Sequence, residues 1–457
     1  MTLSARTSIE DSDLEGMHRP VVVVGGGQAG LSMSYCLTQR GVEHLVLERD
    51  RVGHEWRDRR WDSFCLVTPN WQCQLPGFPY AGDDPDGFMV RDEIARYIEE
   101  YAKSFDPPVV ETVAVTRLRR DRQGRYLVGT SRGELIADQV VLATGPYQVP
   151  LIPRLADRLP EELTQIHSSR YRGPDQLPRG EVLVVGTGQS GCQIAEDLHL
   201  AGRQVHLAVG SAPRVARFYR GRDVVAWLNA MGYYRKAVEE FADVDAVRFR
   251  ANHYVTGRGG GRDIDLRAFA RDGMRLYGRL VAVSGARLRF APDLKQNLDH
   301  ADAVSESIKD SIDSYLEALG IDAAPEPRYA PVWTPERETI QLDLDGTGIT
   351  SVIWSTGFGR DDRWIEVPVF DGRGYPTHDR GVTSSPGLYF LGLPWQHTWG
   401  SGRLSGVAGD AAYLAERITT RAHTGATTSE HLFRWIAGTS TSTYPRDDDW
   451  VAPRTVA

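Results

Sequence analysis

Two stretches of the chain share one pattern, in which a run of apolar, mostly β-branched residues meets a glycine-rich turn and then a helical repeat. The first stretch reads VVVVGGGQAG from Val21, and the second reads VLVVGTGQSG from Val182. Continuous apolar runs of this kind are typical of strands buried on both faces of a parallel sheet. Each stretch therefore predicts the strand, turn and helix that open a dinucleotide-binding unit. The fold class we predict is α/β, with two dinucleotide-binding Rossmann-like domains.

The first turn has the spacing Gly-x-Gly-x-x-Gly, in which each glycine has a separate task. Gly25 permits the tight turn, Gly27 lets the backbone approach a pyrophosphate, and Gly30 lets the helix pack closely on the strand. The helix begins around Gln28, where free N–H groups would face the phosphates. The next predicted strand, HLVLER, carries Glu48 at the place where a carboxylate would accept hydrogen bonds from a ribose. This turn predicts an adenine dinucleotide site.

The second turn repeats the spacing but lacks the acid. Its candidate cofactor residues are Gly186, Gly188, Gln189, Ser190 and Gly191. The strand that follows, QVHLAV, leads into Ser211 and Arg214, with no carboxylate at its end. A 2′-phosphate would repel a carboxylate, whereas a hydroxyl and a guanidinium suit it. We therefore predict NADP rather than NAD at this turn, with an ordinary surface arginine as the alternative for Arg214.

The two turns together indicate the identity of the two cofactors better than either turn does alone. The first turn by itself does not separate FAD from NAD. Two nicotinamide sites in one chain would have no evident redox use, so we expect a retained FAD at the first turn and an exchangeable nicotinamide nucleotide at the second.

The sequence between and after the turns suggests how the domains are connected. The segment ATG around Thr144 is followed by Pro150 and Pro153, which break the chain, and a counterpart, STG, stands at residues 355–357. We predict an FAD-binding domain at 19–154 and 346–420, an NADPH-binding domain at 155–345 with a helical insertion at about 220–325 as a cap, a disordered tail at 1–18, and a C-terminal tail at 421–457.

Composition narrows the class of protein. The formal net charge is -8, and basic clusters such as RDRR at 57–60 are interrupted by acids, so we expect no nucleic-acid partner. No apolar run approaches the ~18 residues of a spanning helix, and we expect a cytoplasmic protein without a membrane anchor. The four cysteines form no C-x-x-C pair, so neither a redox dithiol nor a metal site is indicated.

These features resemble class B flavin-dependent monooxygenases, the group that holds the flavin-containing monooxygenases and the YUCCA enzymes. The likeness covers roughly residues 19–420. It rests on the paired turns, the ATG and STG segments, HEWRDRRWDSFCLVTPNWQCQLPGFPY at 54–80 and QIHSSRYRGPDQLPRGEVLVVG at 165–186. The family fingerprint F-x-G-x-x-x-H-x-x-x-(W/Y) keeps His167 and Tyr171 here, but Glu161 and Leu163 replace its first two residues.

The resemblance implies FAD at the first turn, NADPH at the second, and transfer of one oxygen atom from O2, through a flavin C4a-hydroperoxide, to a small organic substrate at a heteroatom or carbonyl. It also implies roles for individual residues. In TPNWQ, the amides of Asn70 and Gln72 are catalytic candidates, with a plain turn asparagine as the alternative for Asn70. His397 would reach substrate or form a polar rim. The further cofactor candidates are Trp56, Arg57, Thr144 and Asp410.

Other functions remain open from the sequence. A non-oxygenating FAD/NAD(P)H oxidoreductase of the same fold is the main alternative, and a flavin-bound sensor without turnover is a third. The sequence leaves open the substrate, the choice between N- or S-oxygenation and Baeyer–Villiger chemistry, and whether the chain forms a homodimer, because a fold does not fix its site.

Overall fold

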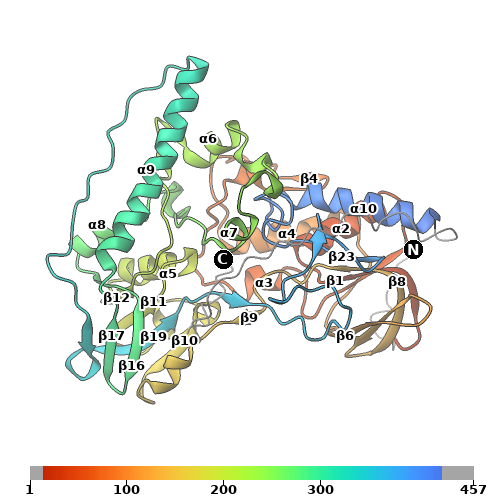
Figure 1. The fold of residues 1–457 in the computed structure, drawn as a ribbon, viewed down its shortest axis with the longest axis horizontal. Coiled ribbons are helices and arrows are strands. Elements are labelled where there is room, and N and C mark those ends of the chain that lie inside the picture. Colours follow the sequence, from red (N-terminus) through yellow and green to blue (C-terminus); the bar gives the residue numbers. More distant parts are fainter. Residues whose placement is uncertain (1–13, 425–457) are drawn as a thin grey trace.

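The computed structural model describes residues 14–424, and its body consists of a mixed nine-stranded sheet and a parallel five-stranded sheet (Figure 1). The first sheet has nine strands, ordered β21-β22-β23-β8-β1-β2-β5, with β7 and then β6 added beside β8. β1, β2, β5, β8 and β23 pair in parallel. The strand bounds are β1 (His18–Val24), β2 (His44–Leu47), β5 (Val109–Val110), β6 (Val115–Arg120), β7 (Tyr126–Thr130), β8 (Gly133–Leu142), β21 (His378–Asp379), β22 (Val382–Thr383) and β23 (Leu388–Phe390).

The valine run of β1 explains the place of this strand at the centre of the sheet. Val21–Val24 are buried, and alternate valines belong to cores on opposite faces of the sheet. Helices cover one face, and the hairpin of β6 and β7 with residues 365–370 covers the other. The helices of this half are α2 (Gln28–Thr38), α3 (His54–Arg57), α4 (Arg91–Phe105) and α10 (Val407–Thr424).

The second sheet has five parallel strands, ordered β10-β19-β11-β12-β15. Its bounds are β10 (Thr164–His167), β11 (Glu181–Val185), β12 (Val205–Ala208), β15 (Arg275–Tyr277) and β19 (Ile349–Trp354). The second glycine turn joins β11 to α5 (Gln189–Leu200), just as the first turn joins β1 to α2. This architecture confirms the predicted α/β class with two Rossmann-like units.

Two antiparallel segments connect the halves. The outgoing chain forms β9 (Val149–Pro150), and the returning chain forms β20 (Phe358–Gly359), which pairs with it. His167 Nε2 lies 3.0 Å from the carbonyl oxygen of Gly357, so this side chain fastens the return segment. Because β19 belongs to the five-stranded sheet, the return follows Trp354 and not residue 346, where we expected it. The domain boundaries otherwise stay a prediction.

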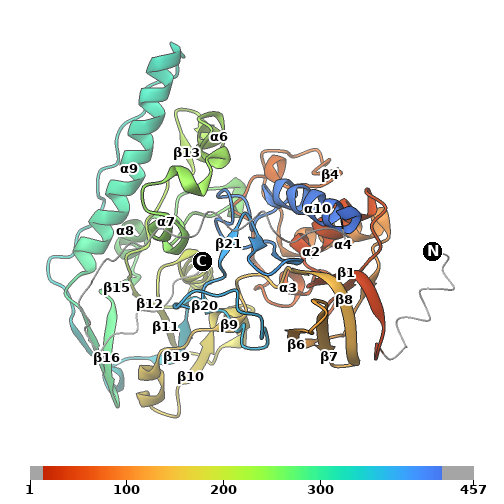
Figure 2. The ribbon, with the colours of Figure 1, turned by 45° about the vertical axis from the view of Figure 1, so that its right-hand side comes forward.

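The predicted helical insertion contains strands as well as helices. Its helices are α6 (Val224–Ala230), α7 (Val244–Phe249), α8 (Leu266–Arg271) and α9 (Leu294–Leu319). Its strands besides β15 are β13 (Phe218–Tyr219), β14 (Arg222–Asp223), β16 (Leu280–Ser284) and β17 (Arg287–Phe290), and β18 (Gln341–Asp343) pairs with β17. α9 projects away from the body of the molecule, so this helix does not cover the rest of the chain as a cap would (Figures 1 and 2).

The remaining elements are short. They are β3 (Gln74–Leu75), β4 (Phe78–Pro79), and the 3-10 helices η1 (Asn70–Gln72), η2 (Arg154–Arg158), η3 (Ser168–Arg170), η4 (Pro174–Gln176), η5 (Tyr233–Arg235), η6 (Val238–Glu240), η7 (Arg258–Gly260) and η8 (Leu344–Gly346).

Part of the predicted N-terminal tail, residues 1–18, is folded against the rest of the chain. Leu14 is fully buried, and its N–H donates to Arg132 O at 2.9 Å, so the ordered chain begins before residue 19. Residues 1–13 of this tail and 425–457 of the predicted C-terminal tail lie outside the described residues.

Candidate functional site

The first glycine turn has a shape that only glycine permits at two of its three positions. Gly25 has φ +108°, and a Cβ there would lie 2.5 Å from Ala143 O. A Cβ on Gly30 would lie 1.8 Å from Gly25 O. At Gly27, by contrast, no atom lies within 4 Å of the Cβ position. The space in front of the α2 N-terminus is therefore open, as a bound pyrophosphate requires.

The second turn reproduces this geometry. Gly186 has φ +103°, with Ser355 O at 2.6 Å from a Cβ position, and a Cβ on Gly191 would lie 1.9 Å from Gly186 O. Gly188 again has open space around its Cβ position. Two turns far apart in sequence thus share the same division between close packing at the third glycine and open space at the second.

Glu48 lies beside the first turn at the end of β2. Its carboxylate accepts hydrogen bonds from the N–H of Gly26 at 2.5 Å and from the N–H of Asp50 at 2.9 Å. Burial raises the pKa of Glu48, and the two backbone donors act in the opposite direction. The predicted ribose-binding acid is thus positioned next to the turn.

Gln28, the first residue of α2, connects two distant segments to this turn. Its Nε2 donates to Gly402 O at 3.4 Å, and its Oε1 accepts from Trp56 Nε1 at 3.4 Å. Trp56 is therefore brought to the turn, and its role in holding the first cofactor stays a prediction. Arg57, its neighbour, instead forms an ion pair with Glu99 of α4.

Buried polar atoms without partners lie in the same half of the molecule. Asp410, in the first turn of α10, pairs with Arg380 through Oδ1 at 3.0 Å, whereas its Oδ2 has no hydrogen-bond partner among the described residues. Ser405 Oγ and Gln72 Oε1 are also buried and unpaired in residues 14–424. Buried polar atoms normally have partners, so these three oxygens indicate that a polar ligand completes this region.

The other candidates of the first half have protein partners. The amide of Asn70 is held by backbone at both ends, since Nδ2 donates to Asp84 O and Oδ1 accepts from Met89 N, each at 2.9 Å. This favours the turn role of Asn70 over the catalytic one. Thr144, after β8, accepts a hydrogen bond from Gln148 Nε2 at 3.0 Å.

At the second turn, Gln189 donates to Val255 O and so ties the start of α5 to the insertion. Ser190 is half-buried in the first turn of α5, and Ser211 is exposed after β12. The backbone N–H of Gly210 donates to Thr187 Oγ1 at 2.9 Å. No acid stands where Glu48 stands in the first half.

The environment of Arg214 differs from the prediction. Arg214 is 3 % exposed, its Nε donates to Asp302 at 2.6 Å, and its guanidinium carbon lies 4.1 Å from the ring centroid of Tyr329. A guanidinium that is neutralised and covered in this way is poorly placed to hold a 2′-phosphate. A buried ion pair is invisible in local sequence because its partner comes from α9.

His397 lies where the late loop, residues 392–406, contacts the insertion. Its carbonyl oxygen accepts from Val238 N at 2.7 Å, and its Nδ1 lies 3.8 Å from Glu239 Oε2. Apolar side chains from the two segments, including Trp395 and Phe241, pack together there. Sequence reasoning missed this contact because no local pattern in residues 233–252 identifies the late loop as its partner.

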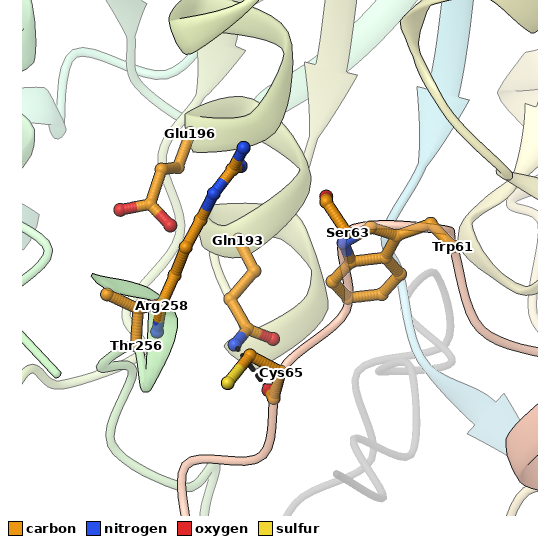
Figure 3. A pocket seen from close by; sticks show the side chains of 7 residues that line it. All are labelled: Trp61, Ser63, Cys65, Gln193, Glu196, Thr256 and Arg258. Carbon is orange, nitrogen blue, oxygen red and sulfur yellow. Dashed lines mark hydrogen bonds between the residues drawn. The ribbon is translucent and has the colours of Figure 1, made fainter. Parts of the chain in front are cut away.

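A small pocket lies between the segment 61–65 and α5 (Figure 3). Its lining comprises Trp61, Ser63, Cys65, Gln193, Glu196, Thr256 and Arg258. Asp197, nearby on α5, accepts hydrogen bonds from Ser63 at 2.5 Å, Arg258 at 2.8 Å and Tyr171 at 2.7 Å. None of the residues predicted for catalysis or cofactor binding lines this pocket, and its polar groups join the first half of the chain to the second.

The described residues also bear on other classes of site. Among residues 14–424, no helix has the length and apolar character to cross a bilayer, and no cluster of three or more His, Cys, Asp or Glu side chains could hold a metal ion. All four cysteines are free and buried. Burial raises the pKa of Cys36 to about 11 and those of Cys65 and Cys73 to about 12.

Comparison with known proteins agrees with this geometry. The family model described as pyridine nucleotide-disulphide oxidoreductase matches residues 22–259. An uncharacterized CzcO-like oxidoreductase of Geobacillus kaustophilus (strain HTA426) is 34% identical over 402 residues, 87% of this chain and 97% of the relative. The indole-3-pyruvate monooxygenase YUCCA6 of Arabidopsis thaliana is 32% identical over 204 residues, 42% of this chain and 48% of the relative.

A solved structure shows the same fold over most of the chain. The flavin-containing monooxygenase from Stenotrophomonas maltophilia superposes with a TM-score of 0.61 at 20% identity, covering 89% of this chain and 99% of that one. The family match, the relatives and the paired turns together confirm the resemblance drawn from the motifs. The chain belongs to the pyridine nucleotide-disulphide oxidoreductase family, with a CzcO-like oxidoreductase as a relative over most of its length.

Proposed function

We propose that the protein is an NADPH-dependent FAD monooxygenase that inserts one oxygen atom from O2 into a small organic substrate, at a heteroatom or a carbonyl. The observation that carries the proposal is the pair of matching glycine turns, each with open space at its second glycine and only one with an acid beside it. One retained and one exchangeable dinucleotide suit this arrangement.

The residues of the first half fit FAD. The N–H groups at the start of α2 would bind its pyrophosphate, and Glu48 would exchange its hydrogen bond with Gly26 for one with the ribose. The unpaired Oδ2 of Asp410 and the unpaired Oε1 of Gln72 are acceptors that polar groups of the cofactor would satisfy. FAD, when bound, supplies hydride acceptance from NADPH and activation of O2.

The second turn fits the adenine half of a nicotinamide nucleotide. The open space at Gly188 and the N-terminus of α5 suit its pyrophosphate. The exposed hydroxyl of Ser211 and the absence of an acid after β12 favour NADPH over NADH, because no carboxylate repels a 2′-phosphate there. Because Arg214 is buried, the proposed preference for NADPH does not depend on its guanidinium.

The late loop and the insertion would close the site. Trp395, Phe241 and Trp399 belong to one aromatic cluster, which would exclude water from the side of the molecule where the late loop contacts α2 through Gln28. Exclusion of water prevents loss of reactive oxygen to hydrolysis and strengthens every polar contact inside. His397, half-buried at the edge of this cluster, stays a candidate for contact with substrate.

A dithiol mechanism, which the family name includes, finds no support in this chain. The four cysteines are buried, and raised pKa values keep the thiols of Cys36, Cys65 and Cys73 protonated at neutral pH. A protonated, buried thiol is a poor nucleophile for disulfide exchange. A non-oxygenating reductase acting on another acceptor remains the rival hypothesis, and experiment separates the two.

The test uses purified, FAD-loaded protein with NADPH, 18O-labelled O2 and a panel of thioethers, amines and ketones. We expect a yellow protein that oxidises NADPH in preference to NADH and gives a product containing one 18O atom per NADPH consumed. Oxidation of NADPH that yields only hydrogen peroxide with every substrate, while an artificial electron acceptor is reduced rapidly, would show a non-oxygenating reductase instead.

A further inference from the structure

Two half-buried arginines near the first turn form no ion pair among the described residues, although Glu55 acts on Arg60 from beyond ion-pair distance. Arg403, in the late loop, donates to Asn252 Oδ1 at 3.0 Å and to the carbonyl oxygen of Trp399, and both acceptors are neutral. Arg60 donates to Arg59 O at 3.2 Å. Among residues 14–424, neither guanidinium lies within ion-pair distance of a carboxylate.

Three more deeply buried arginines of the chain, by contrast, form ion pairs with carboxylates. Arg214 pairs with Asp302 at 2.6 Å, Arg217 pairs with Asp223 at 2.5 Å, and Arg267 pairs with Asp299 at 2.6 Å. A buried charge without a counter-ion is costly, so a protein that neutralises three such cations and leaves two open indicates an external anion.

The surroundings of Arg403 are aromatic. Its guanidinium carbon lies 3.9 Å from the ring centroid of Trp399, and the Trp399 ring lies 4.6 Å from that of Tyr234. Burial lowers the pKa of Arg403, and the phenol groups of Tyr147, Tyr234 and Tyr233 act in the opposite direction. Arg60 is likewise placed over the rings of Trp56 at 5.2 Å and Tyr147 at 5.9 Å.

The two arginines belong to one region of the molecule. Gln28 holds Trp56, on whose ring Arg60 lies, and also holds Gly402, the residue before Arg403. Tyr147 is close to both cations, and it is 40% exposed, so solvent reaches this region. The site thus combines two cations, an aromatic wall, and a position beside the α2 N-terminus.

We propose that Arg403 and Arg60 form an anion subsite that selects a substrate carrying a carboxylate on an aromatic or other apolar body. The inference rests on the proposed monooxygenase function and names its substrate class. Arg403 would bind the carboxylate through its planar fork, and the rings of Trp399 and Tyr234 would contact the apolar body. Arg403 and Arg60 are specificity residues in this proposal, because they bind a part of the substrate away from the oxidised atom.

A phosphate of one of the dinucleotides offers the same anionic chemistry. The geometry favours a substrate, because Trp399, Tyr234 and Asn252 come from the late loop and the insertion, outside both glycine turns. The phosphates already have the backbone N–H groups at the helix N-termini as their binding sites. The experiment separates the two sources.

Binding is measured on the FAD-loaded holoenzyme by calorimetry and by perturbation of the flavin spectrum, without turnover. The probes are benzoate, phenylacetate and 3-phenylpropionate, each compared with its neutral amide. We expect at least one acid to bind about tenfold or more tightly than its amide. In Arg403→Met this ratio falls to about one, and in Arg60→Met it falls severalfold. In the control Arg417→Met, where an exposed arginine lies over the ring of Tyr413, the ratio is unchanged.

Three results would overturn the proposal. The first is that no acid in the series binds more tightly than its amide. The second is that Arg403→Met folds, retains FAD and keeps the wild-type ratio; if it does not fold, Arg60→Met decides in the same way. The third is that Arg403→Met loses FAD or raises the KM for NADPH while acid binding persists, which would assign the anion to a cofactor phosphate. The experiment measures no oxygen transfer, so its result on acid binding can be interpreted even if the protein proves not to be a monooxygenase.

Discussion

The carboxylate of Glu48 accepts a hydrogen bond from the backbone N–H of Gly26 at 2.5 Å, so the acid that ends β2 lies directly on the first glycine turn. A ribose diol that replaces this N–H would meet a carboxylate already in position. Burial raises the pKa of this acid, and hydrogen bonds from bound sugar hydroxyls would act in the opposite direction, as the N–H groups of Asp50 and Gly26 do.

Glu48→Ala is expected to weaken FAD binding roughly tenfold to a hundredfold, because hydrogen bonds to a charged group contribute about 1.5–3 kcal/mol each. Glu48→Gln should fall between this variant and the wild type. FAD content after dialysis and titration of the apoprotein with FAD measure the effect. Wild-type FAD affinity in Glu48→Ala would remove this residue from the cofactor site.

The glycines of the first turn allow a matched comparison. Gly30→Ala places a Cβ 1.8 Å from Gly25 O, so we expect loss of folding or destabilisation of about 3 kcal/mol or more. Gly27→Ala meets no atom within 4 Å, so it should fold with nearly the wild-type Tm and yet lose FAD affinity. Thermal unfolding of the apoproteins and FAD titration together check this. Equal FAD affinity in folded Gly27→Ala and wild type would contradict a pyrophosphate at this turn.

Arg214 should matter for stability and not for coenzyme choice. Arg214→Met removes a hydrogen bond between charged groups, but Asp302 keeps Arg267 as a partner at 2.8 Å, so the free energy of unfolding is expected to fall by about 1.5–3 kcal/mol. The ratio of kcat/KM for NADPH and NADH should stay near the wild-type value, since Arg214 is occupied by Asp302. Denaturant unfolding and steady-state kinetics measure the two quantities.

Ser211→Glu is the matched variant for coenzyme choice. A carboxylate at this exposed position should repel the 2′-phosphate and reduce the preference for NADPH about tenfold or more, with little change in Tm. A selective loss of NADPH in Arg214→Met, together with no effect in Ser211→Glu, would return the 2′-phosphate to Arg214.

We expect His378 in β21 to make the folded protein less stable in acid. Burial lowers the pKa of His378 to about 4, and Arg248 and Arg360 act in the same direction. Its Nδ1 accepts a hydrogen bond from Gly381 N at 3.2 Å, which protonation would break. Above pH 6.5 the side chain is neutral in both states. As the pH falls from 6.5 to about 4, only the unfolded chain binds the proton, so stability decreases by at most about 2 kcal/mol at pH 5.

His378→Gln should therefore show a smaller decrease in Tm between pH 7 and pH 5 than the wild type does. His300→Gln, on the exposed face of α9, serves as the control and should follow the wild type. An identical pH dependence of Tm in His378→Gln and wild type would show that His378 does not contribute to acid sensitivity.

Local patterns predicted the two βαβ openings because their signals are short-range. The glycine spacing, the valine runs and Glu48 all lie within about one supersecondary unit, and the structure places them as the pattern requires. Gln28 and Trp56 also come together, although their contact joins two elements. The family resemblance carried the fold class to nearly the whole chain.

The features that sequence reasoning missed depend on partners far along the chain. The ion pair of Arg214 with Asp302 joins residues 88 positions apart, and the hydrogen bond of Arg403 to Asn252 joins residues 151 positions apart. Arg60 stands in the RDRR cluster, whose acid we took as evidence against a nucleic-acid partner, and the fold places Arg60 over aromatic rings. Side-chain chemistry alone does not specify which of several arginines will lack a counter-ion.

The order of strands in the first sheet has a consequence for synthesis on the ribosome. β7 covers Gly133–Ala137 of β8, but Val140–Leu142 pair with Leu388–Phe390, which are made about 250 residues later. Until then the inner end of β8, already paired with β1 on one side, has no strand on its other side. During this time the ribosome synthesises all the strands of the five-stranded sheet. A nascent chain that pauses before residue 388 thus carries an apolar strand edge available to other chains, and a chaperone that shields this edge would raise the yield of folded protein.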